Sequence, residues 1–151
     1  MTDRSARRWI WAALALQALG YGYDILWHAF LNPGVEPSTV AEMTRHLGTV
    51  HLPLYLGAAC VLAATAVALE HRTRYAPAGR ALPIALAGAG LSAFAEAWHA
   101  TSHLGLDTHH APVFGIMSAA GFLVVVGAMV LSRERVRRRA AGAGRTRRRA
   151  A

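Results

Sequence analysis

Two runs of polar residues recur with helical spacing inside segments that are otherwise apolar. They are Gln17, Tyr21, Asp24 and His28, and Ser92, Glu96, His99 and His103. In each run the intervals are four, three and four residues, so the side chains share one face of a helix. Helical bundles bind metal ions through imidazole and carboxylate side chains that converge in the interior of the bundle. The spacing therefore predicts a metal site of histidines and acids.

Further histidines stand where the next apolar segments begin. The predicted metal-site residues are Asp24, His28, His51, Glu96, His99, His103 and His110. The acids would be ligands or would orient the imidazole tautomers, and His103 would be a spare ligand or a proton relay. His46 and His109 fall in predicted loops and are expected to be solvated. The only cysteine is Cys60, so neither an internal disulfide nor a thiolate metal cage is possible.

The apolar segments that carry these residues are long enough to cross a hydrocarbon core of about 30 Å as helices. Four qualify: residues 9–31, 49–70, 81–104 and 111–132. They predict an all-α integral membrane four-helix bundle over residues 1–132, followed by a basic tail, 133–151, which we expect to be disordered. In the first loop, Ser38 to Leu47 is expected to form a short amphipathic helix, with Ser38 and Glu42 as its N-terminal signal.

The arginines predict the orientation of the bundle. The chain carries a net charge of +8 although it is 54% hydrophobic, and it contains no lysine. Arginines gather before the first span, between the second and third, and after the fourth, whereas the other two loops hold only Arg45. The positive-inside rule then places both termini on the cytoplasmic side of the membrane, which we expect to be the inner (plasma) membrane of the cell. All histidines except His71 fall at the outer side, where bacteria handle copper, so copper is the favoured metal.

The two halves of the sequence resemble each other. Each half has an aromatic residue, a nearby carboxylate and Trp-His, at Tyr23 to His28 and at Phe94 to His99. Each continues with His-x-Pro-x-aromatic, at His51 to Tyr55 and at His110 to Phe114. The order of these features predicts two repeated helical hairpins. Whether the halves share one metal site or form two stays open at this point.

One part of this pattern resembles a known site. Asp24-x-x-x-His28 followed by His51 is similar to the copper-site helices in a membrane subunit of particulate methane and ammonia monooxygenases. The chain also resembles small uncharacterised bacterial membrane proteins with Trp-His, Gly-x-Asp and Pro-His patterns, which correspond here to Trp98-His99, Gly105-x-Asp107 and His110. The interval from His28 to His51 is longer than in the monooxygenases, and Ala95 stands where Asp24 aligns. The resemblance implies copper and does not extend to oxygenation chemistry.

Several other interpretations compete with a copper site. Donor softness alone does not separate copper from zinc or iron. His28 and His99 would be the axial pair of a b-type haem, and His99-x-x-x-His103 with His109-His110 is compatible with a di-iron hydroxylase. Asp24 and Glu96 would also serve a metal-free acid–base enzyme that modifies lipids. A structural or transport subunit would need none of these groups for chemistry.

The composition limits the partners. Runs of arginine beside apolar segments are typical of cytoplasmic anchors on anionic lipid, so we expect the lipid bilayer as the partner and no nucleic acid. A homo-oligomer or a larger membrane complex is compatible with a chain of 151 residues, which leaves little room for a separate substrate domain.

Overall fold

The chain is described by a computed structural model covering residues 3–35, 37–75, 80–106 and 111–149, with side chains for 5–35, 37–71, 80–106 and 112–134. These residues form helices joined by short connections, as predicted. The helices are α1 (Asp3–Leu26), η1 (Trp27–Leu31), α2 (Val40–His46), η2 (Leu47–His51), α3 (Leu52–Tyr75), α4 (Ala81–Leu104) and α5 (Ala111–Arg149). The segments η1 and η2 are π-helical.

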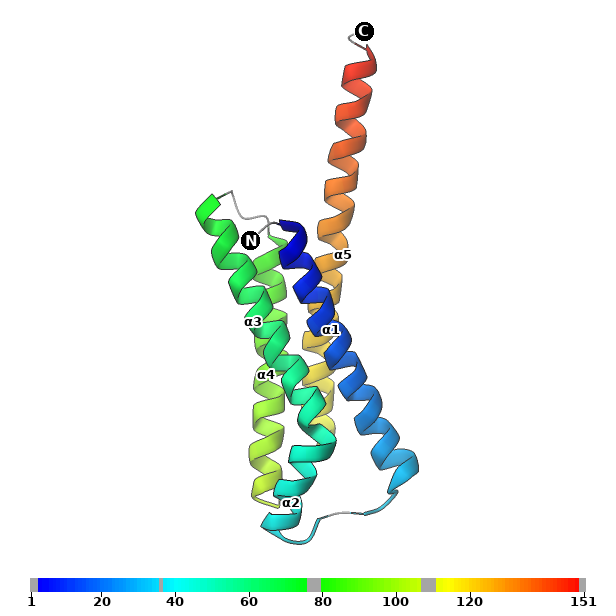
Figure 1. Cartoon of the computed structure of the whole chain (residues 1–151), viewed down its shortest axis with the longest axis vertical. Coiled ribbons are helices and arrows are strands. Elements are labelled where there is room, and N and C mark those ends of the chain that lie inside the picture. Colours follow the sequence, from blue (N-terminus) through cyan, green and yellow to red (C-terminus); the bar gives the residue numbers. More distant parts are fainter. Residues whose placement is uncertain (1–2, 36, 76–79, 107–110, 150–151) are drawn as a thin grey trace.

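Four long helices run side by side (Figure 1). The segments α2, η2 and α3 form one continuous helix. Helix α1 packs along α3, α5 packs along α4, and α3 joins the two pairs, whereas α1 and α5 touch little. The lower end of α1 in Figure 1 leans away from the other helices, and the connection to α2 passes below it.

Glycines let the helices of each pair approach closely. A Cβ atom added to Gly20 on α1 would lie 2.5 Å from the Cα atom of Leu54 on α3, and Gly57 meets Gln17 in the same way. Between α4 and α5, a Cβ atom on Gly121 would lie 2.5 Å from the carbonyl oxygen of Gly88. Small residues at such crossings are typical of helices that pack in membranes.

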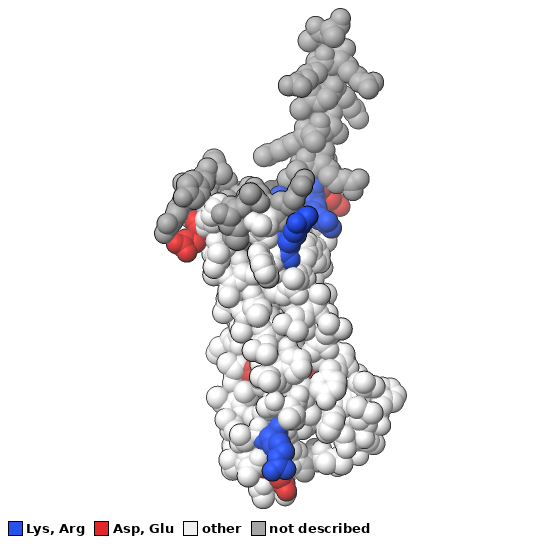
Figure 2. Space-filling model, in the orientation of Figure 1, with Lys and Arg blue, Asp and Glu red and all other residues white. Residues whose placement is uncertain are grey.

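Three of the long helices are long and apolar enough to span a membrane: Val40–His71, Ala81–Leu104 and Pro112–Glu134. This indicates a membrane protein. The charged side chains gather at the two ends of the molecule, and the wide band between them is almost free of them (Figure 2). Helix α1 is not among the three.

The helix that contains the second predicted span begins earlier than expected. The sequence predicts a separate short helix before residue 49, but the chain is helical from Val40 without a break. Its N-cap is Thr39 rather than Ser38. Thr39 Oγ1 accepts a hydrogen bond from the Glu42 amide (3.2 Å), and the Glu42 carboxylate accepts one from the Thr39 amide (3.3 Å). This capping box satisfies backbone donors at both positions.

The last helix is also longer than its predicted span. It starts at Ala111, as expected, and continues to Arg149, through the segment for which the sequence predicts a disordered tail. Alanine and arginine, which make up most of that segment, are among the strongest helix formers.

Candidate metal centre

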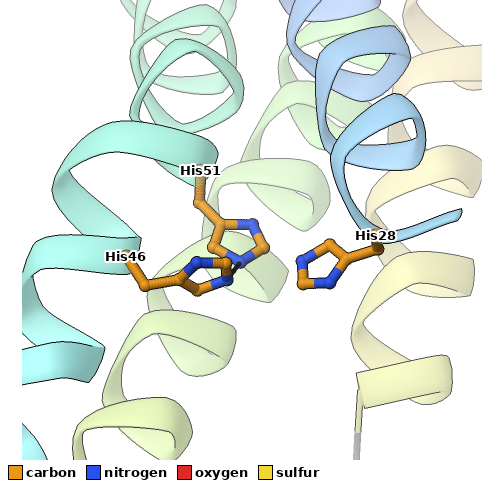
Figure 3. A group of neighbouring side chains, drawn as sticks. All are labelled: His28, His46 and His51. Atoms are coloured by element: carbon orange, nitrogen blue, oxygen red, sulfur yellow. Dashed lines mark hydrogen bonds between the residues drawn. The ribbon is translucent and has the colours of Figure 1, made fainter. Parts of the chain in front are cut away.

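Five histidines from three helical segments meet at one end of the bundle. This histidine cluster consists of His28, His46, His51, His99 and His103. It contains two groups of three, His28/His46/His51 and His51/His99/His103, and within each group one ligand atom per residue lies within 4.8 Å of the others. Figure 3 shows His28 projecting from the end of the first helix toward the other two rings of its group. His51 belongs to both groups, so the cluster is continuous.

The π-helical turn η2 aligns two of these rings. His51 lies five positions after His46, and in an α-helix that interval would turn their side chains about 140° apart. A π-turn has more residues per turn, so the two rings share one face, with their Nε2 atoms 3.2 Å apart. The second π-turn, η1, carries His28. Single π-turns within helices are frequent at functional sites.

His51 lies at the centre of the cluster and is only 2% exposed. Its ring centroid is 5.5 Å from that of His28 and 4.8 Å from that of His46. On the other side it is 4.9 Å from His99 and 5.7 Å from His103. A single side chain therefore connects the histidines of the two hairpins.

Each hairpin also contributes one acid. Asp24 Oδ1 lies 2.7 Å from His51 Nδ1 and 3.7 Å from His28 Nε2. Glu96 Oε2 lies 3.6 Å from His99 Nδ1, and Glu96 is 5% exposed. A carboxylate behind an imidazole fixes its tautomer and raises its basicity toward a metal ion. Asp24 lies close enough to His51 for that role, whereas the 3.6 Å from Glu96 to His99 is longer than a hydrogen bond.

Several buried polar atoms in and beside the cluster form no hydrogen bond. Among the described side chains, the buried atoms that form no hydrogen bond include Asp24 Oδ1, His51 Nδ1, Glu96 Oε2 and His103 Nδ1. Asp24 Oδ1 and His51 Nδ1 lie only 2.7 Å apart, but the contact does not meet hydrogen-bond geometry. Native structures rarely leave such groups unmet, and an ion or water usually accounts for them. Two acids close together, of which Glu96 is buried, also favour a positively charged ion beside them.

A layer of hydrogen bonds closes the bundle beneath the cluster. Gln17 Nε2 donates to Ser92 Oγ (2.7 Å) and to the Tyr21 hydroxyl (3.3 Å). Ser118 Oγ on α5 bonds to Ser92 Oγ (3.0 Å) and to the Tyr21 hydroxyl. Both polar runs thus face the interior, as their spacing predicts, and the layer ties α1 to α4 and α5.

Two residues of the centre are not among the predicted ligands. The sequence predicts that His46 is solvated, because the expected short helix in the first loop is separate from the next span, and the π-turn that joins the two is not visible in the residue pattern. Tyr55 lies one α-helical turn after His51, its ring stacks on that imidazole (5.9 Å), and its hydroxyl is 3.5 Å from His99 Nδ1. The four-residue interval from His51 is the signal that identifies Tyr55.

Most of the predicted site residues lie together. Those that the structure brings into one cluster are Asp24, His28, His51, Glu96, His99 and His103. His110 lies outside the described residues, as do Asp107 and His109. Comparison of the chain with protein-family models, with curated proteins and with solved structures finds no match. The chemistry of the centre must therefore be argued from its own geometry.

Proposed function

We propose that the protein is an integral membrane metalloprotein of the inner membrane, which binds copper at a histidine and carboxylate site near the outer end of its bundle. The observation that carries the proposal is the histidine cluster with its two acids. In protein sites, histidine nitrogen atoms lie about 2.0–2.1 Å from a bound zinc ion. Copper ions are of similar size. Two such nitrogen atoms on one tetrahedral ion are then about 3.3 Å apart. The Nε2 atoms of His46 and His51 are 3.2 Å apart.

The donor set favours copper among the possible ions. Imidazole suits copper, zinc and iron, and the described cluster offers no thiolate. Copper is preferred because the site is proposed to face the outer side. A b-type haem is disfavoured, since His51 occupies the space between His28 and His99, with ring centroids 5.5 Å and 4.9 Å from theirs.

The proposed topology has four spans with both termini in the cytoplasm. The packing of α1 supports the proposal that this helix is also a span, because α1 lies along α3, with Gly20 and Gly57 at the crossing. If α3 crosses the bilayer, α1 must cross beside it. Exposed apolar side chains on α1, such as Leu19 at 71% and Ile25 at 60%, would then face lipid. The two hairpins, α1 with α3 and α4 with α5, are proposed to derive from a repeat.

Metal analysis of purified protein tests the proposal directly. Wild type is compared with the double variant His28→Ala/His99→Ala after equal exposure to copper and removal of free ions. We expect bound copper in wild type and little in the double variant. His71→Ala, which alters a histidine at the opposite end of α3, is the matched control and should keep wild-type content.

Two outcomes would reject the proposal. Equal copper in wild type and in the double variant would mean that the cluster does not hold the ion. A wild-type protein that retains no copper, zinc or iron would mean that the contact between His46 and His51 is a hydrogen bond between the two rings and not part of a metal site.

A further inference from the structure

A cavity of about 500 Å³ adjoins the histidine cluster. Its polar wall includes Asp24, His28, Glu96 and His99, and its apolar wall includes Ile25, Met43, Leu54 and Ala119. Metal ions held by imidazoles need little of this space. A cavity of this size is in the range of sites for organic ligands, about 300–1,000 Å³. The cavity therefore has room for a second ligand beside the metal.

The cavity lies where α1 and α5 separate. At its inner end the two helices touch, because the ring of Tyr21 packs edge-on against Phe122 (5.8 Å) and its hydroxyl bonds to Ser118. Farther toward the outer end, the described residues that line the cavity are Gly115 and Ala119 on α5 and Asp24 and Ile25 on α1. Small residues on one side and a diverging helix on the other leave the two helices with few contacts. Figure 1 shows α1 leaning outward at this level.

In the proposed topology this flank faces the acyl chains of the bilayer. The connection after η1 borders the cavity with Val35 and Pro37, on the side that would face the outer water. A ligand that enters between α1 and α5 would come from the lipid and meet the polar wall with its leading end. Its remaining part would stay among apolar side chains or acyl chains.

We infer that this cavity binds a membrane-dissolved amphiphile with an uncharged hydroxyl head, which enters between α1 and α5. The inference rests on the proposed membrane topology and deepens the proposed metal function by naming the class of its second ligand. The apolar chain lies against Ile25, Leu54 and Ala119. The head lies among Asp24, His28 and Glu96.

The polar wall favours a neutral hydroxyl. A hydroxyl donates one hydrogen bond and accepts others, so it can donate to a carboxylate and accept from an imidazole N–H at the same time. A carboxylate head would be repelled by Asp24 and Glu96 in surroundings of low dielectric constant. An ammonium head would compete with the metal ion for the same acids.

Photolabelling in lipid bilayers tests the inference. Purified protein is reconstituted in phospholipid vesicles with a long-chain alcohol that carries a diazirine on its alkyl chain, and labelled peptides are mapped by mass spectrometry. We expect saturable labelling of peptides around Ile25 and Ala119, which excess unlabelled alcohol abolishes. The fatty acid of equal chain length should compete more weakly. Labelling spread evenly over all four helices, or equal competition by the acid, would overturn the inference.

Gly115→Leu supplies a variant that fills the cavity. Gly115 lines it, and a Cβ atom there meets nothing within 4 Å, so the larger side chain does not clash with the backbone. We expect saturable labelling to fall to the level seen with excess competitor. Gly22→Leu, on α1, is the matched control because its Cβ position is equally open, and it should label as wild type does. Unchanged saturable labelling in Gly115→Leu would contradict the inference.

Metal content, measured on the same samples, separates this inference from the proposed function. Copper that is retained in Gly115→Leu while the labelling is lost supports both. Copper without saturable labelling in wild type rejects the amphiphile alone, and saturable labelling without copper rejects the metal alone. Ala119→Leu repeats the test if Gly115→Leu does not fold.

Discussion

The Nε2 atoms of His46 and His51 lie 3.2 Å apart although the two residues are five positions apart in the sequence. The π-turn Leu47–His51 produces this pairing, because its extra residue rotates the preceding turn relative to α3. The turn lies inside a continuous helix, between α2 and α3. A π-turn replaces regular α-helical hydrogen bonds, and such insertions are rare and often occur at functional sites. The pairing is therefore the feature that a metal site explains best.

Removing the extra residue should disconnect His46 from the cluster. Deletion of Gly48 would restore an α-helical turn and rotate the segment before it by about 100°. We expect copper content to fall to the level of His46→Ala, measured by metal analysis of the purified proteins.

Gly48→Ala is the control for this deletion. A Cβ atom at Gly48 meets nothing within 4 Å, and the substitution keeps the length of the turn. Copper binding should stay as in wild type. If the deletion and Gly48→Ala bind copper equally well, the π-turn has no part in the site.

Asp24 should raise the affinity of the cluster for copper. Its carboxylate lies 2.7 Å from His51 Nδ1, and groups that hold a ligating histidine typically account for 10–100-fold in metal affinity. Asp24→Asn keeps the shape but removes the charge, so we expect the Kd for copper to rise by about that factor. Competition with a chelator of known affinity measures it.

Glu134→Gln removes an exposed acid at the other end of the bundle and should leave the Kd unchanged. An equal rise in Kd in both variants would assign the effect to overall charge instead of to contact with His51.

The sequence predicts the helices well but not the irregular turns within them. The span at 81–104 coincides with α4 (Ala81–Leu104) because its apolar residues and its polar run both follow the helical period. The polar runs on α1 and α4 face the interior for the same reason. These features depend on one repeating interval that can be read directly from residue types.

The position of His46 could not be predicted in the same way. A helical period of 3.6 residues puts it on a different face from His51, and the sequence contains no marker that shows where the period is interrupted. The central place of His51 between both hairpins also depends on the packing of α3 on α4 and on the close approach within each pair at Gly20, Gly57 and Gly121. Periodicity within single helices does not specify those contacts.

Copper should raise the thermal stability of the protein. An ion that binds only the folded state stabilises it by about 2.7 kcal/mol at 100 times its Kd. We expect the Tm of wild type in detergent to rise on addition of copper and to return after chelation. His51→Ala, which removes the ring shared by both groups, should show no such rise, whereas His71→Ala should respond as wild type does. A similar rise in His51→Ala would locate the stabilising ion elsewhere.

Close packing of α4 on α5 should make Gly121 sensitive to a single methyl group. A Cβ atom there would lie 2.5 Å from the Gly88 carbonyl oxygen and 2.7 Å from the Ser92 amide nitrogen, so the helices must separate. Overpacking of this kind typically costs about 1–3 kcal/mol. We expect Gly121→Ala to lower the Tm. Gly127→Ala on the same helix, where the Cβ position is open, should not lower it, and equal Tm values for the two variants would contradict the observed packing.

The orientation of the bundle can be tested with single cysteines. Cys60 is exposed on α3 within the apolar band, so it is first replaced by alanine. Ser38→Cys, in the connection before α2, and Glu134→Cys, near the end of the apolar part of α5, then report on opposite ends of the molecule. In intact cells a membrane-impermeant maleimide should label Ser38→Cys and should reach Glu134→Cys only after the membrane is opened. The reverse pattern would place the histidine cluster on the cytoplasmic side, and the argument for copper from its location would then fail even if the metal site itself is retained.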